Sequence, residues 1–283
     1  MTMAYAEVIG DPISHSKSPM IHKFWLDQAG IAADYRATHV MPDRLAAHFS
    51  SRRADPLWRG SNVTIPHKQA VIPLLDRLDP AAEKIGAVNT VRPENGALVG
   101  YNTDFAGFLE PLQPLLARSH LFRMARMFGA GGAAKAIALA LASQGFTIVV
   151  AARNLDQARA LRASFGPDDS LIAPLSHFAE PTDFAWDDRS GVLDLVVNTT
   201  SLGMTGQPPL LVDFSHVPPG AVVYDIVYSP LETPLLAEAQ ARGHQVINGL
   251  AMLIGQAAEA FALFFGQPAP RDHDADLRRM LTA

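Results

Sequence analysis

The sequence of 283 residues contains no cysteine. This absence excludes disulfide scaffolds, thiolate metal sites and thiol nucleophiles, and it suits the reducing cytoplasm, where we expect the chain to reside. Residues 1–10 also lack the basic stretch followed by an apolar core that a secretory signal needs. We therefore expect no export signal.

A strong charge of one sign and a long unbroken apolar run are missing as well. The net charge is −5, a balance that favours neither nucleic acid nor an anionic membrane surface. The most apolar late segment, 246–265, is interrupted by Asn248, Gln256 and Glu259. Because such side chains are costly at membrane depth, we interpret the segment as a buried helix. We expect a small-molecule partner, with no nucleic acid and no membrane.

Three catalytic signatures do not occur in the sequence. The histidines show no His-Glu-x-x-His or similar ligand spacing, so we expect no metal. Neither the G-x-S-x-G of α/β hydrolases nor the G-x-x-x-x-G-K of phosphate-binding loops is found. We interpret His15, His22 and His67 as surface or packing groups.

Apolar runs of strand length alternate with amphipathic runs of helix length along the whole chain, which is typical of parallel strands joined by crossover helices. The sequence therefore predicts an α/β fold, and 283 residues suffice for two cores. We expect one domain over 1–104, a second over 105–248, and helices within 249–283 that pack back on the first domain.

Several local elements can be predicted individually. We expect a strand over 4–10, a helix that begins at Ser18 and ends at Gly30, and a helix over 68–78. Glu94-Asn95-Gly96 predicts a hairpin turn, since Asn-Gly supplies the positive φ angles that a tight turn requires. Ser18 taken alone is best explained as a helix cap.

The sequence GAGGAA over 129–134 matches the glycine-rich turn of dinucleotide-binding folds. Glycines there let the backbone approach a pyrophosphate at a helix N-terminus. The preceding strand reads RMARMF, and Arg123 and Arg126 are unusual in a buried central strand. A plain glycine-rich turn therefore stays open as an alternative.

Arg153 follows the next predicted strand, where a dinucleotide fold places the residue that selects the adenosine ribose. An acidic residue would favour NAD, whereas a guanidinium suits the 2′-phosphate of NADP. The alternative is a solvated surface arginine, so its position carries more weight than its identity.

Polar side chains gather on predicted loops and strand ends, where binding groups concentrate. Residues 62–68 combine an amide, a hydroxyl and the Lys68 ammonium, while Asn89 and residues 102–104 add two amides and a carboxylate. The inventory suits a polyhydroxylated acid as ligand.

Taken together, these segments resemble the shikimate dehydrogenase family in order and spacing over roughly residues 5–266. The resemblance is carried by VIGDPISHSKSP (8–19), NVTIPHK (62–68), IGAVNTV (85–91), NTD (102–104), GAGGA (129–133), NTTSLGM (198–204), YDIVYSP (224–230) and GLAMLIGQ (249–256).

The resemblance implies reversible, NADPH-dependent reduction of 3-dehydroshikimate to shikimate, an oxidoreductase step on a CH–OH group in the chorismate and aromatic amino acid pathway. It makes 1–104 a substrate-binding catalytic domain and 105–248 a Rossmann-like NADP-binding domain, with Lys68 and Asp104 as the catalytic pair. The implied substrate contacts are Ser16 and Ser18 at the carboxylate, Thr64, Asn89 and Gln256 at the ring hydroxyls, and Tyr228. The implied cofactor contacts are Gly129, Ala130, Gly131, Gly132, Ala133, Arg153, Ile226 and Gly249.

The chain departs from the family pattern after the second cofactor strand. Ala152 and Asn154 flank Arg153 where the family usually has Asn-Arg-Thr, and Gln157 replaces a second arginine. One phosphate contact is thereby removed, so the expected preference for NADP is weakened. An NAD-linked quinate/shikimate dehydrogenase and a non-catalytic dinucleotide-binding sensor remain alternatives, and the oligomeric state stays open between monomer and homodimer.

Overall fold

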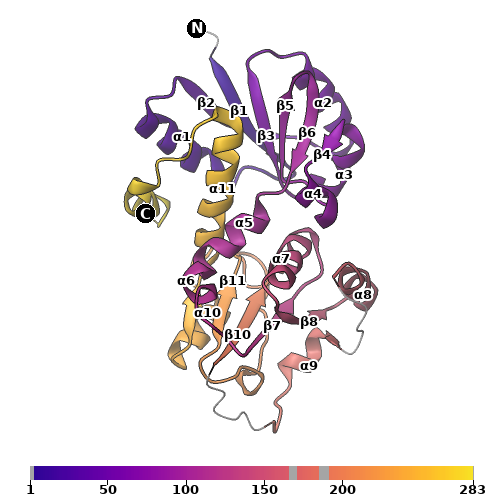
Figure 1. Cartoon of the computed structure of the whole chain (residues 1–283), viewed down its shortest axis with the longest axis vertical. Helices are drawn as coiled ribbons and strands as arrows, with labels where there is room; N and C mark the ends of the chain where they lie inside the picture. Colours follow the sequence, from indigo (N-terminus) through magenta and orange to yellow (C-terminus); the bar gives the residue numbers. More distant parts are fainter. Residues whose placement is uncertain (1–2, 166–170, 185–190, 283) are drawn as a thin grey trace. The chain divides into compact units, whose positions relative to one another are not determined.

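The structure, a computed structural model, describes residues 3–165, 171–184 and 191–282 (Figure 1). The chain divides into two compact units. The first unit comprises Met1–Gly107 and Ile254–Ala283, and the second comprises Phe108–Leu253. None of the helices in the described parts of the chain is long and apolar enough to span a bilayer.

The first unit is built on a mixed sheet of six strands in the order β2-β1-β3-β5-β6-β4. β1 pairs in parallel with β2 and β3, whereas β5 is antiparallel to both β3 and β6. The strands are β1 (Ala4–Gly10), β2 (Ala33–His39), β3 (Trp58–Val63), β4 (Arg77–Leu78), β5 (Thr90–Glu94) and β6 (Ala97–Tyr101). The predicted strand over 4–10 and the hairpin are confirmed, and Asn95 and Gly96 adopt φ angles of 51° and 84° in its turn.

Helices cover both faces of this sheet. In Figure 1, α1 and α11 lie to its left and α2, α3 and α4 to its right. Their bounds are α1 (Ser18–Ala29), α2 (Leu45–Arg53), α3 (His67–Ala70), α4 (Pro80–Ile85), α5 (Asp104–Leu109), α11 (Gly249–Phe265) and α12 (Asp274–Thr282). Pro19 in the first turn and a left-handed Gly30 after the last turn define the ends of α1, as the sequence predicts.

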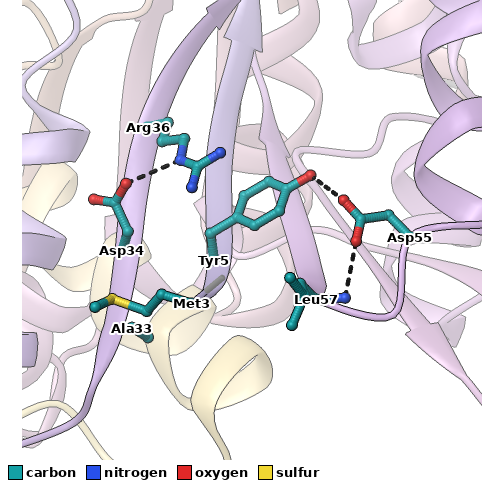
Figure 2. Close-up of a pocket in the computed structure, with 7 residues that line it drawn as sticks. All are labelled: Met3, Tyr5, Ala33, Asp34, Arg36, Asp55 and Leu57. Carbon is teal, nitrogen blue, oxygen red and sulfur yellow. Dashed lines mark hydrogen bonds and ion pairs between the residues drawn. The ribbon is translucent and has the colours of Figure 1, made fainter. Parts of the chain in front are cut away.

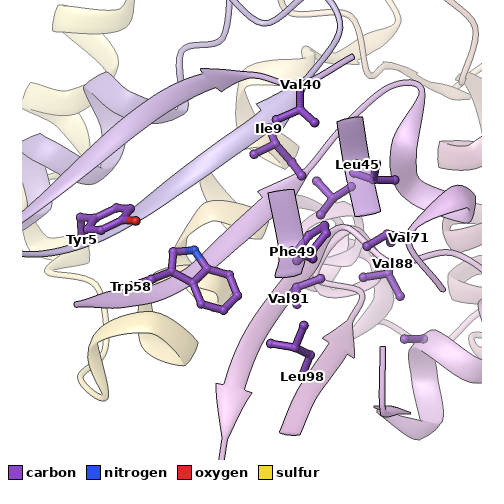
Figure 3. Packing of buried hydrophobic residues seen from close by; sticks show 12 residues of the cluster. Tyr5, Ile9, Val40, Leu45, Phe49, Trp58, Val71, Val88, Val91 and Leu98 are labelled. Atoms are coloured by element: carbon purple, nitrogen blue, oxygen red, sulfur yellow. The ribbon is translucent and has the colours of Figure 1, made fainter. Parts of the chain in front are cut away.

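The core between the sheet and α2 is made of buried aromatic and branched side chains (Figure 3). Phe49 of α2 packs edge-on against Trp58 of β3, with ring centroids 6.4 Å apart. Each such side chain contributes about 1.5–3 kcal/mol through burial. This core fixes the positions at which β1 and β3 end, and therefore the loops that follow them.

Two local predictions for the first unit are wrong. The helix predicted over 68–78 is limited to α3, because Pro73 lacks a backbone N–H and Asp76 N–H donates to Leu98 O, which draws the chain into pairing with β6. Ser18 is not the cap of α1 either. Lys17 occupies the N-cap position, and the Ser18 N–H donates to Ser16 Oγ at 3.3 Å.

The second unit has a parallel sheet of six strands in the order β12-β11-β10-β7-β8-β9. The strands are β7 (Phe122–Phe128), β8 (Thr147–Ala152), β9 (Ile172–Pro174), β10 (Val192–Asn198), β11 (Val222–Asp225) and β12 (Gln245–Ile247). The helices are α6 (Gln113–Leu116), α7 (Gly132–Ser143), α8 (Leu155–Ala163), α9 (Leu175–Ala179) and α10 (Pro234–Ala241). The strand order reverses between β7 and β10, where doubly wound folds bind ligands at the carboxyl ends of the strands.

The two arginines of β7 are accommodated by specific partners. Buried Arg126 donates to Asp194 Oδ1 on the neighbouring strand β10 at 3.1 Å. Arg123 donates to the backbone oxygens of Leu116 and Gln144. Their charges are thus compatible with a central strand because each guanidinium is hydrogen-bonded.

His22 of α1 is buried in the first unit without a hydrogen bond. Its ring stacks on Tyr35 with centroids 3.9 Å apart and also contacts Phe261 of α11. Within the described chain neither ring nitrogen has a partner. Burial therefore lowers the pKa of His22 to about 3, and the folded protein keeps this imidazole neutral.

Neutral burial of His22 predicts a loss of stability in mild acid. The unfolded chain takes up a proton near pH 6.5 whereas the folded chain does not, so the free energy of unfolding falls by about 1.4 kcal/mol per pH unit below that point. Urea denaturation at pH 7 and pH 5 should show that His22→Phe loses about 2 kcal/mol less than the wild type over this interval. Equal losses in the two proteins would contradict the buried neutral imidazole.

Candidate active site

Lys68 and Asp104 meet in the first unit although 36 positions separate them along the chain. Lys68 lies in α3, just after β3, and Asp104 is the first residue of α5, just after β6. Lys68 Nζ donates to Asp104 Oδ2 at 2.5 Å, and the two side chains are 17% and 7% exposed. An ion pair so shielded from water is only weakly screened by salt.

The second oxygen of Asp104 is held by Asn89. Asn89 Nδ2 donates to Asp104 Oδ1 at 3.0 Å and to Thr103 Oγ1 at 2.9 Å, and Asn89 Oδ1 accepts from the Thr103 backbone N–H and from Thr90 Oγ1. The ammonium and the amide therefore bind opposite oxygens of one carboxylate. This arrangement fixes the plane of the carboxylate and the direction of the lysine.

Residues 102 and 103 build the turn that presents Asp104. Asn102 Oδ1 accepts from the Asp104 backbone N–H, and Asn102 Nδ2 donates to Ala87 O. Thr103 Oγ1 lies 3.5 Å from Gln256 Oε1 of α11. No individual role was predicted for Thr103, because its neighbours in sequence do not indicate that its hydroxyl reaches two side chains 14 and 153 positions away.

Ser16 and Ser18 lie in the loop between β1 and the first turn of α1. Ser16 Oγ accepts from the Ser18 N–H, and no partner for Ser18 Oγ is found among the described residues. Lys17, between them, donates to Leu281 O in the last turn of α12 at 2.5 Å. The loop that presents the two hydroxyls is thus anchored to α12 through Lys17.

Thr64 directly follows β3, next to the end of β1 that leads into the Ser16 and Ser18 loop. Its N–H donates to Ile9 O and its C=O accepts from the His67 N–H, so its position is set by the ends of β1 and β3. Because β6 runs parallel to β3 and β5 runs opposite, the segments after β1, β3 and β6 and before β5 share one edge. Ser16, Ser18, Thr64, Lys68, Asn89 and Asp104 all come from these four segments.

A hollow of about 620 Å³ opens at the other edge of this sheet, near the amino ends of β1 and β2 (Figure 2). Its polar groups are paired with one another: Tyr5 donates to Asp55 Oδ2 at 2.7 Å, and Arg36 Nε donates to Asp34 Oδ2 at 2.9 Å. None of the predicted site residues lines it.

In the second unit, the glycine-rich turn follows β7 and opens α7. Gly129 has φ of +112°, and a Cβ there would lie 2.5 Å from Thr199 Oγ1, so this position requires glycine. A Cβ on Gly131 or Gly132 would meet nothing within 4 Å. Gly131 is the N-cap of α7 and provides no side-chain cap, so its side chain does not occupy the first N–H groups of the helix. With half-buried Ala130 and Ala133 beside them, these residues fit a pyrophosphate.

Arg153 follows β8 on the same unit. It is exposed and makes no ion pair within the described residues. Asn154, which departs from the family pattern, caps α8 by accepting from the Asp156 and Gln157 N–H groups at 3.0 and 3.1 Å. Asn154 therefore still caps the start of α8, although it departs from the family pattern. Arg153 provides the guanidinium at the end of β8.

The loop after β11 carries Ile226 and Tyr228. Asp225 is fully buried and accepts from the Val227 N–H, from Thr233 and from Asn198 at 2.7–2.9 Å. Burial raises the pKa of Asp225 more than these hydrogen bonds lower it. Burial also raises the pKa of half-buried Tyr228, so its phenol stays protonated as a hydrogen-bond donor.

Gly249, at the start of α11, lies against the same loop. A Cβ at this position would be 2.2 Å from Ile226 O and 2.5 Å from Val227 O. Its need for glycine is thus explained by backbone packing. Ile226, Tyr228 and Gly249 belong to the second unit, whereas Lys68, Asp104 and the serines belong to the first.

Comparison with known proteins identifies the family. A family model described as the shikimate dehydrogenase substrate binding domain matches residues 8–91, and one described as the shikimate 5′-dehydrogenase C-terminal domain matches residues 249–275. A shikimate dehydrogenase (NADP(+)) of Sphingopyxis alaskensis is 49% identical over 281 residues, which are 99% of this chain and 97% of that protein. The chain belongs to the shikimate dehydrogenase family.

Other members of the family agree in sequence and in structure. A shikimate dehydrogenase (NADP(+)) of Azorhizobium caulinodans is 42% identical over 99% of this chain and 96% of its own length. The crystal structure of shikimate 5-dehydrogenase from Thermus thermophilus, in complex with NADP(H) and shikimate, superposes with a TM-score of 0.82 at 34% identity, covering 99% of this chain and 100% of that one. The resemblance and the predicted fold, a substrate domain with a Rossmann-like NADP domain, are confirmed.

The contrast between Gly249 and Gly132 can be tested with one matched change, since each is the first residue of a helix. Gly249→Ala should destabilise the protein by about 1–3 kcal/mol, because the new methyl group meets backbone that cannot yield cheaply. Gly132→Ala should leave stability unchanged or raise it by up to about 1 kcal/mol. Thermal unfolding of both variants measures the difference, and equal midpoints would refute the packing explanation for Gly249.

Proposed function

We propose that this chain is an NADP-dependent shikimate dehydrogenase that interconverts 3-dehydroshikimate and shikimate in the chorismate and aromatic amino acid pathway. The observation that carries the proposal is the Lys68–Asp104 pair, held in one geometry within a chain that is 49% identical to a shikimate dehydrogenase (NADP(+)) over nearly its whole length. The pair combines a proton donor with a carboxylate that orients it. Carbonyl reduction requires such a donor within hydrogen-bond distance of the substrate oxygen.

The reaction moves a hydride between the nicotinamide and the substrate carbon, and a proton between the protein and the substrate oxygen. The bound nicotinamide supplies the hydride for reduction of the ketone carbon and accepts it in the reverse direction. Lys68 donates a hydrogen bond to the carbonyl oxygen and stabilises the negative charge that develops there, and the Lys68–Asp104 pair then gives this oxygen the proton that completes the hydroxyl group. In the oxidative direction, the Lys68–Asp104 pair accepts the proton that leaves the hydroxyl oxygen.

Asp104 directs this chemistry through its geometry. One of its oxygens holds Lys68 at 2.5 Å and the other accepts from Asn89 at 3.0 Å, so the ammonium cannot rotate away without losing a charged partner. Fixed donors of this kind need no reorganisation when charge develops on the substrate.

The substrate carboxylate is assigned to the hydroxyls of Ser16 and Ser18. The lack of a partner for Ser18 Oγ among the described residues, and the anchoring of Lys17 to α12, support this assignment. Thr64, Asn89 and Gln256 are assigned to the ring hydroxyls, and Tyr228 of the second unit to the substrate. Hydroxyl and amide groups suit a polyhydroxylated ring because each can donate or accept.

NADP is assigned to the second unit. Gly129, Gly131 and Gly132 leave room for the pyrophosphate at the start of α7, with Ala130 and Ala133 flanking it. Arg153 is assigned to the 2′-phosphate, and Ile226 with Gly249 to the nicotinamide end. We place the enzyme in the cytoplasm. It is assigned as a monomer or homodimer, and sedimentation of the purified protein would decide between these two oligomeric states.

Replacement of Lys68 tests the catalytic assignment. Lys68→Ala should lower kcat for shikimate oxidation by about 10²- to 10⁴-fold, the usual scale for a general acid or base, with a modest change in KM. Lys84→Ala, which replaces an exposed lysine of α4, is the matched control and should keep full activity. A folded Lys68→Ala protein with wild-type kcat would overturn the assignment.

The same assays separate the proposal from its alternatives. Shikimate and quinate should each be tested with NADP+ and NAD+. Faster turnover of quinate with NAD+ would favour a quinate/shikimate dehydrogenase, and nucleotide binding without any turnover would favour a sensor.

Replacement of Arg153 tests the cofactor assignment. Loss of a charge-assisted hydrogen bond to phosphate costs about 1.5–3 kcal/mol, so Arg153→Ala should weaken NADPH binding roughly 10- to 100-fold. NADH binding should change little. Arg159→Ala, which removes an exposed arginine of α8 paired with Asp156, should affect neither. Fluorescence titration of both cofactors provides the measurement, and equal weakening of NADPH and NADH would remove the phosphate argument.

A further inference from the structure

Thr103 is the point at which three residues assigned to the site are joined. Its backbone N–H donates to Asn89 Oδ1 at 2.8 Å, its Oγ1 accepts from Asn89 Nδ2 at 2.9 Å, and its Oγ1 lies 3.5 Å from Gln256 Oε1. Asp104 is its neighbour in sequence. Thr103 itself is 5% exposed, so these contacts are made away from bulk water.

An asparagine amide has two faces of opposite character, and Thr103 distinguishes them. The N–H of Thr103 selects the carbonyl oxygen of Asn89, and the hydroxyl oxygen of Thr103 accepts from its NH2 group. With the amide held in this sense, the second Nδ2 proton points to Asp104 Oδ1 at 3.0 Å. An amide turned by 180° would place its NH2 group against the Thr103 N–H and its oxygen against the Asp104 carboxylate. The backbone N–H and the carboxylate therefore fix the sense of the amide, and the Thr103 hydroxyl adds a further hydrogen bond to it.

The orientation of Asn89 in turn decides which oxygen of Asp104 meets the lysine. Oδ1 is occupied by Asn89, and Oδ2 holds Lys68. The hydroxyl proton of Thr103 is committed at the same time, because its oxygen accepts from Asn89 and only its O–H is available to donate toward Gln256 Oε1. One hydroxyl therefore binds two amides on different elements, one in the loop before β5 and one on α11.

We propose that Thr103 is a positioning residue whose hydroxyl holds the amides of Asn89 and Gln256 in place and, through Asn89, supports the alignment of the Lys68–Asp104 pair. The kinetic part of this inference rests on the proposed shikimate dehydrogenase activity. In this role Thr103 acts through Asn89 and Gln256, which are assigned to the substrate, and through the catalytic pair that Asn89 supports.

Thr103→Val tests the inference, because valine keeps the branched shape and the backbone N–H but removes the hydroxyl. We expect kcat for shikimate oxidation to fall about 10- to 100-fold and the KM for shikimate to rise several-fold, which corresponds to the loss of one oriented hydrogen bond in each contact. The KM for NADP+ should stay within about two-fold, since the residues assigned to NADP+ lie in the second unit. Thr103→Ser, which restores the hydroxyl, should recover activity to within about three-fold of wild type.

The matched control is Thr38→Val. Thr38 of β2 donates to Glu7 Oε2 at 2.6 Å, so this change also removes a threonine hydroxyl from the first unit but none from the site. It should lower the unfolding midpoint without changing kcat or the KM for shikimate. Wild-type kinetics in Thr103→Val, or a Thr103→Ser protein as impaired as Thr103→Val, would overturn the proposal.

A second measurement does not depend on turnover. The side-chain amide protons of Asn89 should exchange with solvent roughly ten-fold faster or more in Thr103→Val than in the wild type or in Thr38→Val, as followed by NMR. Unchanged exchange would refute the positioning role even if kinetics altered. A wild-type protein that does not oxidise shikimate with NADP+ would instead refute the proposed function, and the exchange measurement would still decide whether Thr103 orients Asn89.

Discussion

The Asp104 carboxylate is the constraint on which the proposed catalytic site of the first unit depends. It has two oxygens, and each has a different partner: the Lys68 ammonium on one side and the Asn89 amide on the other. A carboxylate bound from one side only would leave the lysine free to swing. Binding from both sides converts a flexible four-carbon side chain into a donor of fixed direction, which is what the proposed catalytic role of Lys68 requires.

The sheet of the first unit creates this constraint by its mixed topology. Lys68 follows β3, Asp104 follows β6 and Asn89 precedes β5. Because β5 is antiparallel to its two neighbours, the beginning of β5 lies at the same edge as the ends of β3 and β6. A fully parallel sheet would carry the residue before β5 to the opposite edge. The antiparallel hairpin, with Asn95 and Gly96 in its turn, is thus part of how the site is assembled.

The glycines of the second unit serve two physical purposes. Gly129 and Gly249 have no side chain because neighbouring protein atoms lie 2.5 Å and 2.2 Å from the position of a Cβ, whereas Gly131 and Gly132 have open space in front of them and leave room for a ligand.

Glu7 in β1 is fully buried, and although burial raises its pKa, hydrogen bonds from His48, Arg52 and Thr38 outweigh that effect and bring it to about 2. Its charge is tolerated because each oxygen has donors. Residue type alone predicts neither the purpose of a glycine nor the charge of a buried acid.

Periodicity and turn chemistry in the sequence determined the α/β class, β1, the ends of α1, the hairpin and the glycine turn before α7, because these depend on residues close together along the chain. Motif order also pointed to Lys68, Asp104 and Asn89 as candidates. The length of α3, the N-cap of α1 and the partners of Arg126 were decided by tertiary structure, since each depends on a neighbouring segment. The proposed role of Thr103 belongs to the same group, because its hydroxyl contacts Asn89 and Gln256 only when strand pairing and α11 bring these distant residues within hydrogen-bond distance.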